Sequence, residues 1–264
     1  MGRDYSSISP SARSLLLVKA QTALPYAREA AAILFGEEAI EAARRDAATT
    51  PGAAVRVRHF EARARSVDAA LAAVGATRVL ELAAGLSFRG LAMAERPGVF
   101  YLDTDLPAVA ALKADLVAQL HPAPLAGTLR VEPLDALDAS AFASTVGELP
   151  AGPLAVVQEG LLMYLGADEK ACLAASIRQA LLARGGAWVT ADVYVRNPGG
   201  AQPYREERTK EFLAKHRVEE NKFESFDAAA AFFAEHGFAV ARQVTRRADD
   251  PWGVRETWVL LPVP

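Results

Sequence analysis

The segment VLELAAGLSFRG, residues Val79–Gly90, decides how the rest of the chain is interpreted. An apolar run that suits a buried strand ends in a turn of small residues, and an amphipathic segment follows. The turn keeps one glycine, Gly85, where a nucleotide-binding loop normally has two or three. The pattern therefore predicts a strand, a turn and a helix, and it leaves two roles open for the turn: a ligand-binding loop, or only a tight connection.

Short apolar runs alternate with helix-like segments from residue 78 onward. This order is typical of right-handed βαβ units, which build a parallel sheet with helices on both faces. The last two apolar runs, GFAVARQVTRR and VRETWVLLPV, are separated only by ADDPWG, which is too short for a helix. We therefore expect an α/β fold with a seven-stranded, mostly parallel sheet that ends in an antiparallel pair.

Residues 1–70 have a different texture and are rich in alanine, leucine and glutamate, which favours helices. In the third helical stretch, VRVRHFEARARSVDAALAAVG, the spacing of Phe60, Val67 and Leu71 suits one helix face. We expect an N-terminal helical layer over 1–70 and an α/β domain over 71–264, together one compact unit. A polar stretch with glycines and prolines, at about 196–226, is interpreted as a lid between the fifth and sixth strands.

The composition excludes several classes of protein. With 52% hydrophobic and 23% charged residues, the chain of 264 residues is typical of a globular protein. A net charge of −3 without a basic stripe argues against nucleic-acid partners. The apolar runs are too short to span a membrane, no signal peptide is evident, and a single cysteine fits a reducing compartment. We expect a soluble cytoplasmic protein without a metal site, as a monomer or a homodimer.

Acidic residues stand at the predicted ends of three strands. Asp105 follows Gly85 by 20 residues, a spacing at which a carboxylate can accept both hydroxyls of a ribose. Asp105 can also cap the helix that follows it, and the two roles can coexist. Asp135 can face an adenine amino group or serve only as a loop or capping residue. Glu159 ends the fourth strand, where a poorly solvated carboxylate needs a cationic or hydrogen-bonding partner.

Three segments in this order, RVLELAAGLSFRGLAM, FYLDTDLPAVAALK and QEGLLMYL, resemble the leucine carboxyl methyltransferase-like family of class I methyltransferases. The resemblance covers roughly residues 5–195. It implies a Rossmann-like class I methyltransferase fold with S-adenosyl-L-methionine as methyl donor and S-adenosyl-L-homocysteine as product. The family includes enzymes that methylate a protein C-terminal carboxylate and others that act on polyketide-type small molecules.

The resemblance also implies the residues that bind the cofactor. Arg58, or otherwise Arg63, would pair with the cofactor carboxylate through the fork of a guanidinium, and Lys19 is a further candidate in the same pocket. Asp105 would hold the ribose and Asp135 would lie beside the adenine. The full set is Arg58, Arg63, Glu81, Ala83, Ala84, Gly85, Asp105, Leu106, Asp135, Ala136, Glu159 and Gly160.

This chain departs from the family at two positions of the turn. The family usually has a glycine where Ala83 stands and an aspartate where Ser87 stands. We expect the alanine to be tolerated if its backbone keeps φ below zero. The serine removes a charge near the loop, which puts that contact of the family in doubt.

The proposed reaction is in-line attack by an acceptor oxygen on the sulfonium methyl. A carboxylic acid with a pKa near ~4 is ionised at neutral pH, whereas a phenol near ~10 needs a general base. None of the four histidines falls on a predicted strand end, which favours a carboxylate acceptor. The catalytic residues are unassigned, with Tyr164, Tyr204 and His216 as candidates. The candidates for substrate binding are Tyr164, Tyr194, Tyr204 and Arg205.

Other functions stay open at this point. The favoured acceptor is a small molecule such as a polyketide or another secondary metabolite; the alternatives are a phenol or alcohol, or a protein C-terminal carboxylate. A module that binds the cofactor with little turnover is a further alternative. A dinucleotide-dependent dehydrogenase is disfavoured because its turn normally has a fuller set of glycines.

Overall fold

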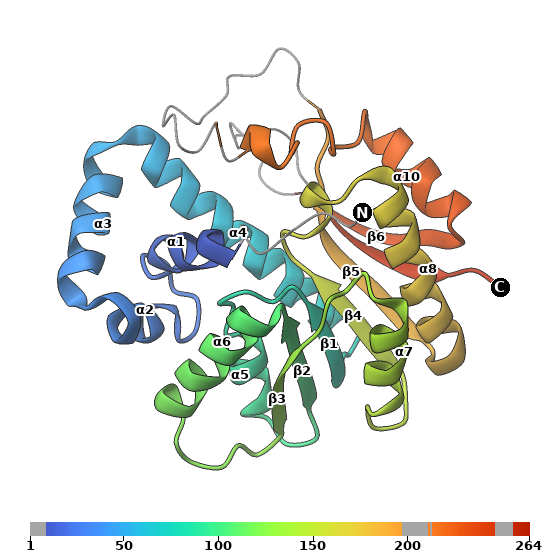
Figure 1. Ribbon diagram of the computed structural model, residues 1–264, viewed down its shortest axis with the longest axis horizontal. Helices are drawn as coiled ribbons and strands as arrows, with labels where there is room; N and C mark the ends of the chain where they lie inside the picture. The colour runs from blue at the N-terminus through green and yellow to red at the C-terminus, as the bar shows by residue number, and fades with distance from the viewer. Residues whose placement is uncertain (1–8, 197–210, 212, 246–255) are drawn as a thin grey trace.

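The computed structural model describes residues 9–196, 211, 213–245 and 256–264. Within these residues the chain forms a seven-stranded sheet of order β3-β2-β1-β4-β5-β7-β6 (Figure 1). The strands are β1 Arg78–Leu82, β2 Phe100–Asp105, β3 Thr128–Pro133, β4 Leu154–Gln158, β5 Gly186–Val193, β6 Phe238–Thr245 and β7 Glu256–Pro262. Strands β1 to β5 pair in parallel, and β7 runs antiparallel to both β5 and β6. The expected sheet and its antiparallel end are confirmed.

Helices cover both faces of this sheet (Figure 1). One face packs against α7, α8 and α10, which contribute Phe142, Leu173 and Phe233 to one hydrophobic cluster. The other face packs against α4, α5 and α6. The described α-helices are α1 Ser9–Lys19, α2 Ala27–Phe35, α3 Glu37–Thr49, α4 Pro51–Ala73, α5 Arg89–Ala94, α6 Pro107–Leu120, α7 Ala139–Gly147, α8 Ala167–Arg184 and α10 Phe226–Glu235. None of the described helices is long and apolar enough to cross a membrane.

Helix α4 joins the N-terminal helices to the sheet. Phe60, Val67 and Leu71 are all buried, as their spacing predicts. Val67 and Leu71 pack on the strands, while Phe60 packs against Val18 of α1. The helix continues through residue 70, where the sequence suggested a boundary, so the division into a helical layer and an α/β domain stays a prediction.

Gly90 in α5 lies where that helix meets β2. A methyl group added at Gly90 would lie 2.7 Å from Cδ1 of Tyr101 and 2.8 Å from Oδ2 of Asp103. Both neighbours are buried, so they cannot move aside into solvent. We expect Gly90→Ala to lower the free energy of unfolding by roughly 1–3 kcal/mol, the usual cost of overpacking, although alanine is the better helix former.

Urea denaturation followed by circular dichroism measures this effect. Gly147→Ala at the end of α7 is the matched control, because no heavy atom lies within 4 Å of its added methyl group. The control should be as stable as the wild type or slightly more stable. Equal stability of the two variants would contradict the close approach of α5 to β2.

Candidate functional site

The carboxyl ends of β1, β2 and β4 lie at one edge of the sheet. Strand β1 sits between the other two, with Glu81 opposite Asp103 of β2 and Leu82 opposite Gln158 of β4. The chain order reverses at this point, because β2 and β3 lie on one side of β1 and β4 lies on the other. Ligands of open α/β sheets bind beyond the strand ends at such a switch point. The loops that carry Gly85, Asp105 and Glu159 therefore meet here.

Asp105 ties the turn after β1 to the end of β2. Its Oδ2 accepts a hydrogen bond from the backbone N–H of Gly85 at 2.7 Å, and its Oδ1 accepts one from Leu106 at 2.7 Å. The N–H of Ala84 donates to the carbonyl of Thr104 at 2.9 Å. Burial raises the pKa of Asp105, while the two backbone donors oppose this rise. The predicted cap is wrong, because Leu106 is the N-cap residue of α6 and no side chain caps that helix. Each carboxylate oxygen of Asp105 has a second lone pair, which can accept a further hydrogen bond.

The conformation of Ala83 differs from our expectation. Ala83 has φ of +49°, in the left-handed region, and Gly85 has φ of +53°. The condition under which we expected the alanine to be tolerated, φ below zero, is not met, because the turn from β1 to α5 holds this residue in the left-handed conformation. An L-residue with a Cβ atom adopts it at a cost of roughly 1–2 kcal/mol. The alanine therefore strains the loop at the position where the family usually has glycine.

We expect Ala83→Gly to stabilise the protein by about 0.5–1 kcal/mol, because the relief of strain exceeds the entropy that glycine adds to the unfolded chain. Chemical denaturation measures the difference. Ala84→Gly is the control, since Ala84 does not have positive φ, and it should destabilise the protein by a similar amount. Destabilisation by both substitutions would contradict strain at Ala83.

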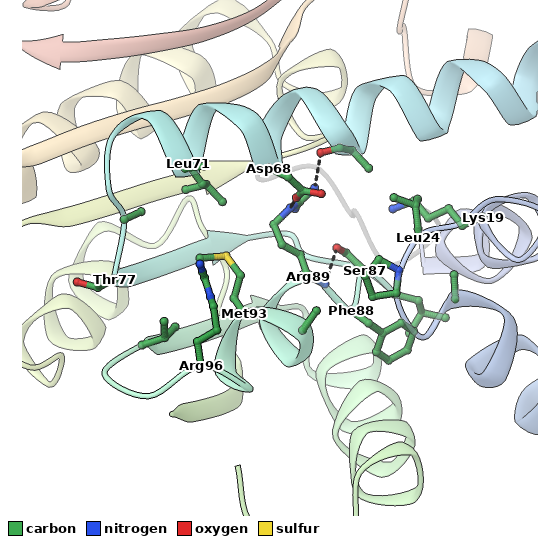
Figure 2. Close-up of a pocket in the computed structure, with 18 of the residues that line it drawn as sticks. Lys19, Leu24, Asp68, Leu71, Thr77, Ser87, Phe88, Arg89, Met93 and Arg96 are labelled. Carbon is green, nitrogen blue, oxygen red and sulfur yellow. Dashed lines mark hydrogen bonds and ion pairs between the residues drawn. The ribbon is translucent and has the colours of Figure 1, made fainter. Parts of the chain in front are cut away.

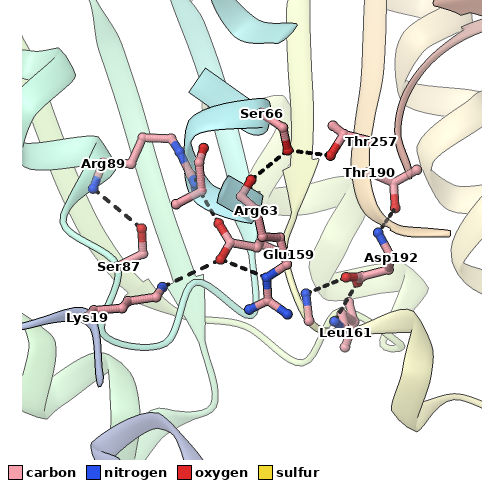
Figure 3. Close-up of polar contacts among 12 residues, drawn as sticks. Lys19, Arg63, Ser66, Ser87, Arg89, Glu159, Leu161, Thr190, Asp192 and Thr257 are labelled. Carbon is pink, nitrogen blue, oxygen red and sulfur yellow. Dashed lines mark hydrogen bonds and ion pairs between the residues drawn. The ribbon is translucent and has the colours of Figure 1, made fainter. Parts of the chain in front are cut away.

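A buried cluster of ion pairs surrounds Glu159 (Figure 3). Its Oε1 accepts a hydrogen bond from Nε of Arg63 at 3.0 Å and lies 3.6 Å from Nζ of Lys19. Its Oε2 accepts one from Nη2 of Arg89 at 2.6 Å. Burial alone would raise the pKa of Glu159, but these three cations outweigh burial and hold its pKa well below the ordinary value. Glu159 is therefore ionised at neutral pH and is a poor proton acceptor.

Arg89, the first residue of α5, joins three carboxylates. The contacts are Nε to Asp68 Oδ1 at 2.6 Å, Nη1 to Glu81 Oε1 at 2.5 Å, and Nη2 to Glu159 Oε2 at 2.6 Å. Glu81 also accepts a hydrogen bond from the hydroxyl of Tyr101 at 2.5 Å. Arg89 was not among the site residues predicted from the sequence. A signal was present, since a lone arginine within the segment SFRGLAM is a candidate partner for the two acids at nearby strand ends.

The structure brings Arg63, and not Arg58, to the strand ends. Arg58 is exposed on α4. The guanidinium of Arg63 is buried; Nη1 donates to the hydroxyl of Tyr194 at 2.9 Å, and Nε donates to Glu159. In the part of the chain that the structure describes, Nη2 of Arg63 has no hydrogen-bond partner. It faces Gly160, where an added methyl group would lie 3.4 Å away.

Asp192 near the end of β5 fixes the loop after β4. Its carboxylate accepts hydrogen bonds from the backbone N–H groups of Gly160 at 2.6 Å, Leu161 at 2.6 Å and Leu162 at 3.0 Å. Gly160 has φ of +95°, which favours glycine. Asp192 was not among the predicted site residues, because it lies within a continuous strand pattern. Its role is to hold the backbone beside Arg63 and Glu159.

Asp135 and Ala136 follow β3 at the same edge. Asp135 is exposed, and its Oδ1 accepts a hydrogen bond from the N–H of Leu137 at 3.0 Å, which is a loop role that the sequence left open. The N–H of Leu134 donates to the carbonyl of Asp105 at 2.9 Å, so the turn lies beside Asp105. Contact of Asp135 with an adenine stays a prediction.

Two of the candidates for catalysis lie together. Tyr164 belongs to the short 3-10 helix η2 (Leu162–Tyr164), and its ring meets the ring of His216 edge to face, with centroids 5.9 Å apart. Burial and the neighbouring Lys215 lower the pKa of His216, so its imidazole is mostly neutral near pH 7. Tyr194 is buried against Arg63 and does not form an open wall.

Part of the expected lid lies outside the described residues. This applies to Tyr204 and Arg205, whose proposed roles stay predictions. The described end of that stretch is attached to the core: Nδ2 of Asn221 donates to the carbonyl of Met163 at 3.2 Å, and the N–H of Phe223 donates to the carbonyl of Tyr194 at 2.9 Å. In the described residues, no group of three or more His, Cys, Asp and Glu side chains could hold a metal ion.

The strand order and the switch point beside β1 define the class I methyltransferase fold. The solved structure of mitomycin 7-O-methyltransferase superposes with a TM-score of 0.53, at 15% identity, over 99% of this chain and 76% of that one. Magnesium protoporphyrin IX methyltransferase from Synechocystis PCC 6803, solved with bound S-adenosylhomocysteine, superposes with a TM-score of 0.51, at 11% identity, over 79% of this chain and 85% of that one. At these identities the likeness concerns the fold.

A family model described as leucine carboxyl methyltransferase matches residues 9–178. The chain belongs to this family, as the three sequence segments predicted. A curated relative, a putative S-adenosyl-L-methionine-dependent methyltransferase from Mycolicibacterium paratuberculosis (strain ATCC BAA-968 / K-10), is 37% identical over 115 residues. That match spans 43% of this chain and 36% of the relative, so it covers about a third of the relative's length.

Proposed function

We propose that this chain is an S-adenosyl-L-methionine-dependent O-methyltransferase that transfers a methyl group to a carboxylate oxygen of a small molecule. Membership in the leucine carboxyl methyltransferase family supports the reaction class. The observation that carries the proposal is the convergence at one sheet edge of a left-handed turn at Gly85, the carboxylate of Asp105 and the Glu159–Arg63 pair.

The charged groups of this edge fit the cofactor. Nη2 of Arg63 and the ammonium of Lys19 would hold the methionine carboxylate, and Asp105 would accept the ribose hydroxyls. Burial lowers the pKa of Lys19, and the attraction of Glu159 opposes this change. Asp135 and Ala136 would flank the adenine. When bound, the cofactor supplies a methyl group on a sulfonium, which is electrophilic without help from the protein.

The protein's part in the reaction is then positioning. Holding the acceptor oxygen in line with the methyl group contributes roughly 7–11 kcal/mol in favourable cases. Three cations hold Glu159 ionised, so it is a poor proton acceptor, and the ribose hydroxyls would occupy the free lone pairs of Asp105. A carboxylic acid, ionised above a pKa of ~4, needs no proton acceptor. These features support a carboxylate as the acceptor.

A hydroxyl acceptor is the second candidate, and the contact of Tyr164 with His216 favours it. A neutral imidazole can accept the proton of a phenol or an alcohol, with a rate gain of roughly 10²–10⁴-fold. His216 lies within the expected lid, and Tyr164 lies in η2, shortly after the carboxyl end of β4. Substitution of His216 by alanine would slow transfer to a hydroxyl and leave transfer to a carboxylate unchanged.

The first experiment measures binding of S-adenosylhomocysteine and of NAD by calorimetry. We expect S-adenosylhomocysteine to bind and NAD not to bind. Absence of S-adenosylhomocysteine binding would defeat the proposal.

The second experiment uses a donor with a labelled methyl group and a panel of carboxylic acids, phenols and a peptide with a C-terminal leucine. Mild alkali releases label from an ester and not from an ether. Alkali-stable label would support the hydroxyl, peptide labelling would indicate a protein acceptor, and binding without any turnover would indicate a binding module.

A further inference from the structure

A pocket of about 550 Å³ lies between α4, α5 and the turn that joins α1 to α2 (Figure 2). The residues at the strand ends, Gly85, Asp105, Asp135 and Glu159, do not line it. The pocket forms because α5 has only six residues and faces small side chains of α4. Most of its wall is apolar and includes Leu24, Leu71, Phe88 and Met93.

Among the described residues that line this pocket, Asp68 is the single carboxylate. Its side chain is 45% exposed, and its Oδ1 accepts the hydrogen bond from Nε of Arg89 at 2.6 Å. Arg89 is its sole partner among the described residues, so Oδ2 can accept a further hydrogen bond. A charge-assisted hydrogen bond to a carboxylate that borders apolar surface is stronger than the same bond in open water.

Two cations of the described lining, Lys19 and Arg89, already have carboxylate partners and are less available to a ligand than Asp68. Arg89 already contacts three carboxylates, and Lys19 lies 3.6 Å from Glu159. Arg96 is exposed, as Asp68 is, so water screens a charged ligand at either residue. A positively charged group would find an acceptor in Oδ2 of Asp68 beside apolar surface, whereas Arg96 is the one cation of the described lining left for a negatively charged group.

We propose that this pocket is a second small-molecule site, which adjoins the strand ends through Lys19 and Arg89 and binds an amphipathic organic cation. The ammonium group of this ligand donates a hydrogen bond to Oδ2 of Asp68, and its aromatic or aliphatic portion packs against Leu71 and Met93. The volume of about 550 Å³ is in the range of ligand pockets, whose walls are usually mostly apolar with a few polar groups, as they are here. The proposal does not depend on the function proposed above.

Calorimetry on the full chain tests this proposal with 2-phenylethylamine as the probe. 2-Phenylethanol and phenylacetate serve as the neutral and anionic controls, because they have the same phenyl ring and a similar short carbon chain. We expect the amine to bind at least tenfold more tightly than either control. Equal binding of the alcohol would overturn the role of Asp68, and tighter binding of phenylacetate would overturn the choice of a cation.

Two variants locate the binding site. Asp68→Asn should weaken amine binding at least tenfold, and Ala72→Trp should do so by filling the pocket from an exposed position on α4. Arg96→Gln, the control, should leave amine binding unchanged or strengthen it. The folding of each variant is checked by its thermal unfolding. Full amine affinity in the folded Ala72→Trp variant would overturn the proposal even if Asp68→Asn failed to fold.

Discussion

Replacement of Arg89 by methionine is expected to lower the free energy of unfolding by about 3–5 kcal/mol, the usual cost of removing one partner from a buried ion pair. Methionine keeps the apolar stem and removes the guanidinium that contacts Asp68, Glu81 and Glu159. Glu159, whose side chain is 3% exposed, retains Arg63 and Lys19. Glu81, at 1% exposure, retains only the hydroxyl of Tyr101 among the described residues. The loss of stability therefore comes mainly from the buried charge of Glu81, which is left without a cation.

Urea denaturation measures this loss, and two further variants identify its cause. Arg65→Met removes an exposed partner of Glu61 on α4, where the side chain is 53% exposed, and should cost less than about 1 kcal/mol. Glu81→Gln added to Arg89→Met removes the unpaired charge and should restore part of the stability. A loss for Arg89→Met no larger than that for Arg65→Met would show that the cluster contributes little to the folded state.

The sheet could be predicted from the sequence, because the pattern that marks each strand is local in the chain. Each strand is an apolar run bounded by turn residues, and the connector before β7 is too short for a helix, which leaves an antiparallel pair as the solution. Strand-end acids were also predictable, because the carboxyl ends of parallel neighbours meet at one edge. The positions of Asp105 and Glu159 follow from this rule and from nothing specific to their side chains.

The ion pairs were harder to predict, because they join residues far apart in the sequence. Arg89 contacts Glu159, 70 residues away, and no local pattern specifies that pairing. Helix periodicity did contain one unused signal. Arg63 precedes the buried Val67 by four residues, which places both on one helix face, whereas Arg58 has no such relation to it. The positive φ of Ala83 had no signal in the alanine itself, which seldom adopts it; the glycine usual at this position in the family was the unused signal.

The assignment of Arg63, and not Arg58, to the cofactor carboxylate leads to the second large expected effect, which is on cofactor affinity. Arg63→Met is expected to weaken binding of S-adenosylhomocysteine by roughly 10–100-fold, because a hydrogen bond between charged groups contributes about 1.5–3 kcal/mol. Arg58→Met, the control on the exposed face of α4, should change the affinity by less than about twofold. Calorimetry gives both values, and thermal unfolding confirms that each variant is folded. Weaker binding in Arg58→Met alone would reverse the assignment.

A loss of affinity in Arg63→Met has a second explanation, because Arg63 also holds Glu159 and Tyr194 in place. Methylthioadenosine separates the two, since it has the adenosine and sulfur of the cofactor without the amino-acid carboxylate. If Arg63 binds that carboxylate directly, Arg63→Met weakens S-adenosylhomocysteine and leaves methylthioadenosine nearly unchanged. Equal weakening of both would show that Arg63 acts by positioning Glu159. Arg63→Lys should recover part of the affinity, because an ammonium keeps the charge but lacks the two parallel donors of a guanidinium.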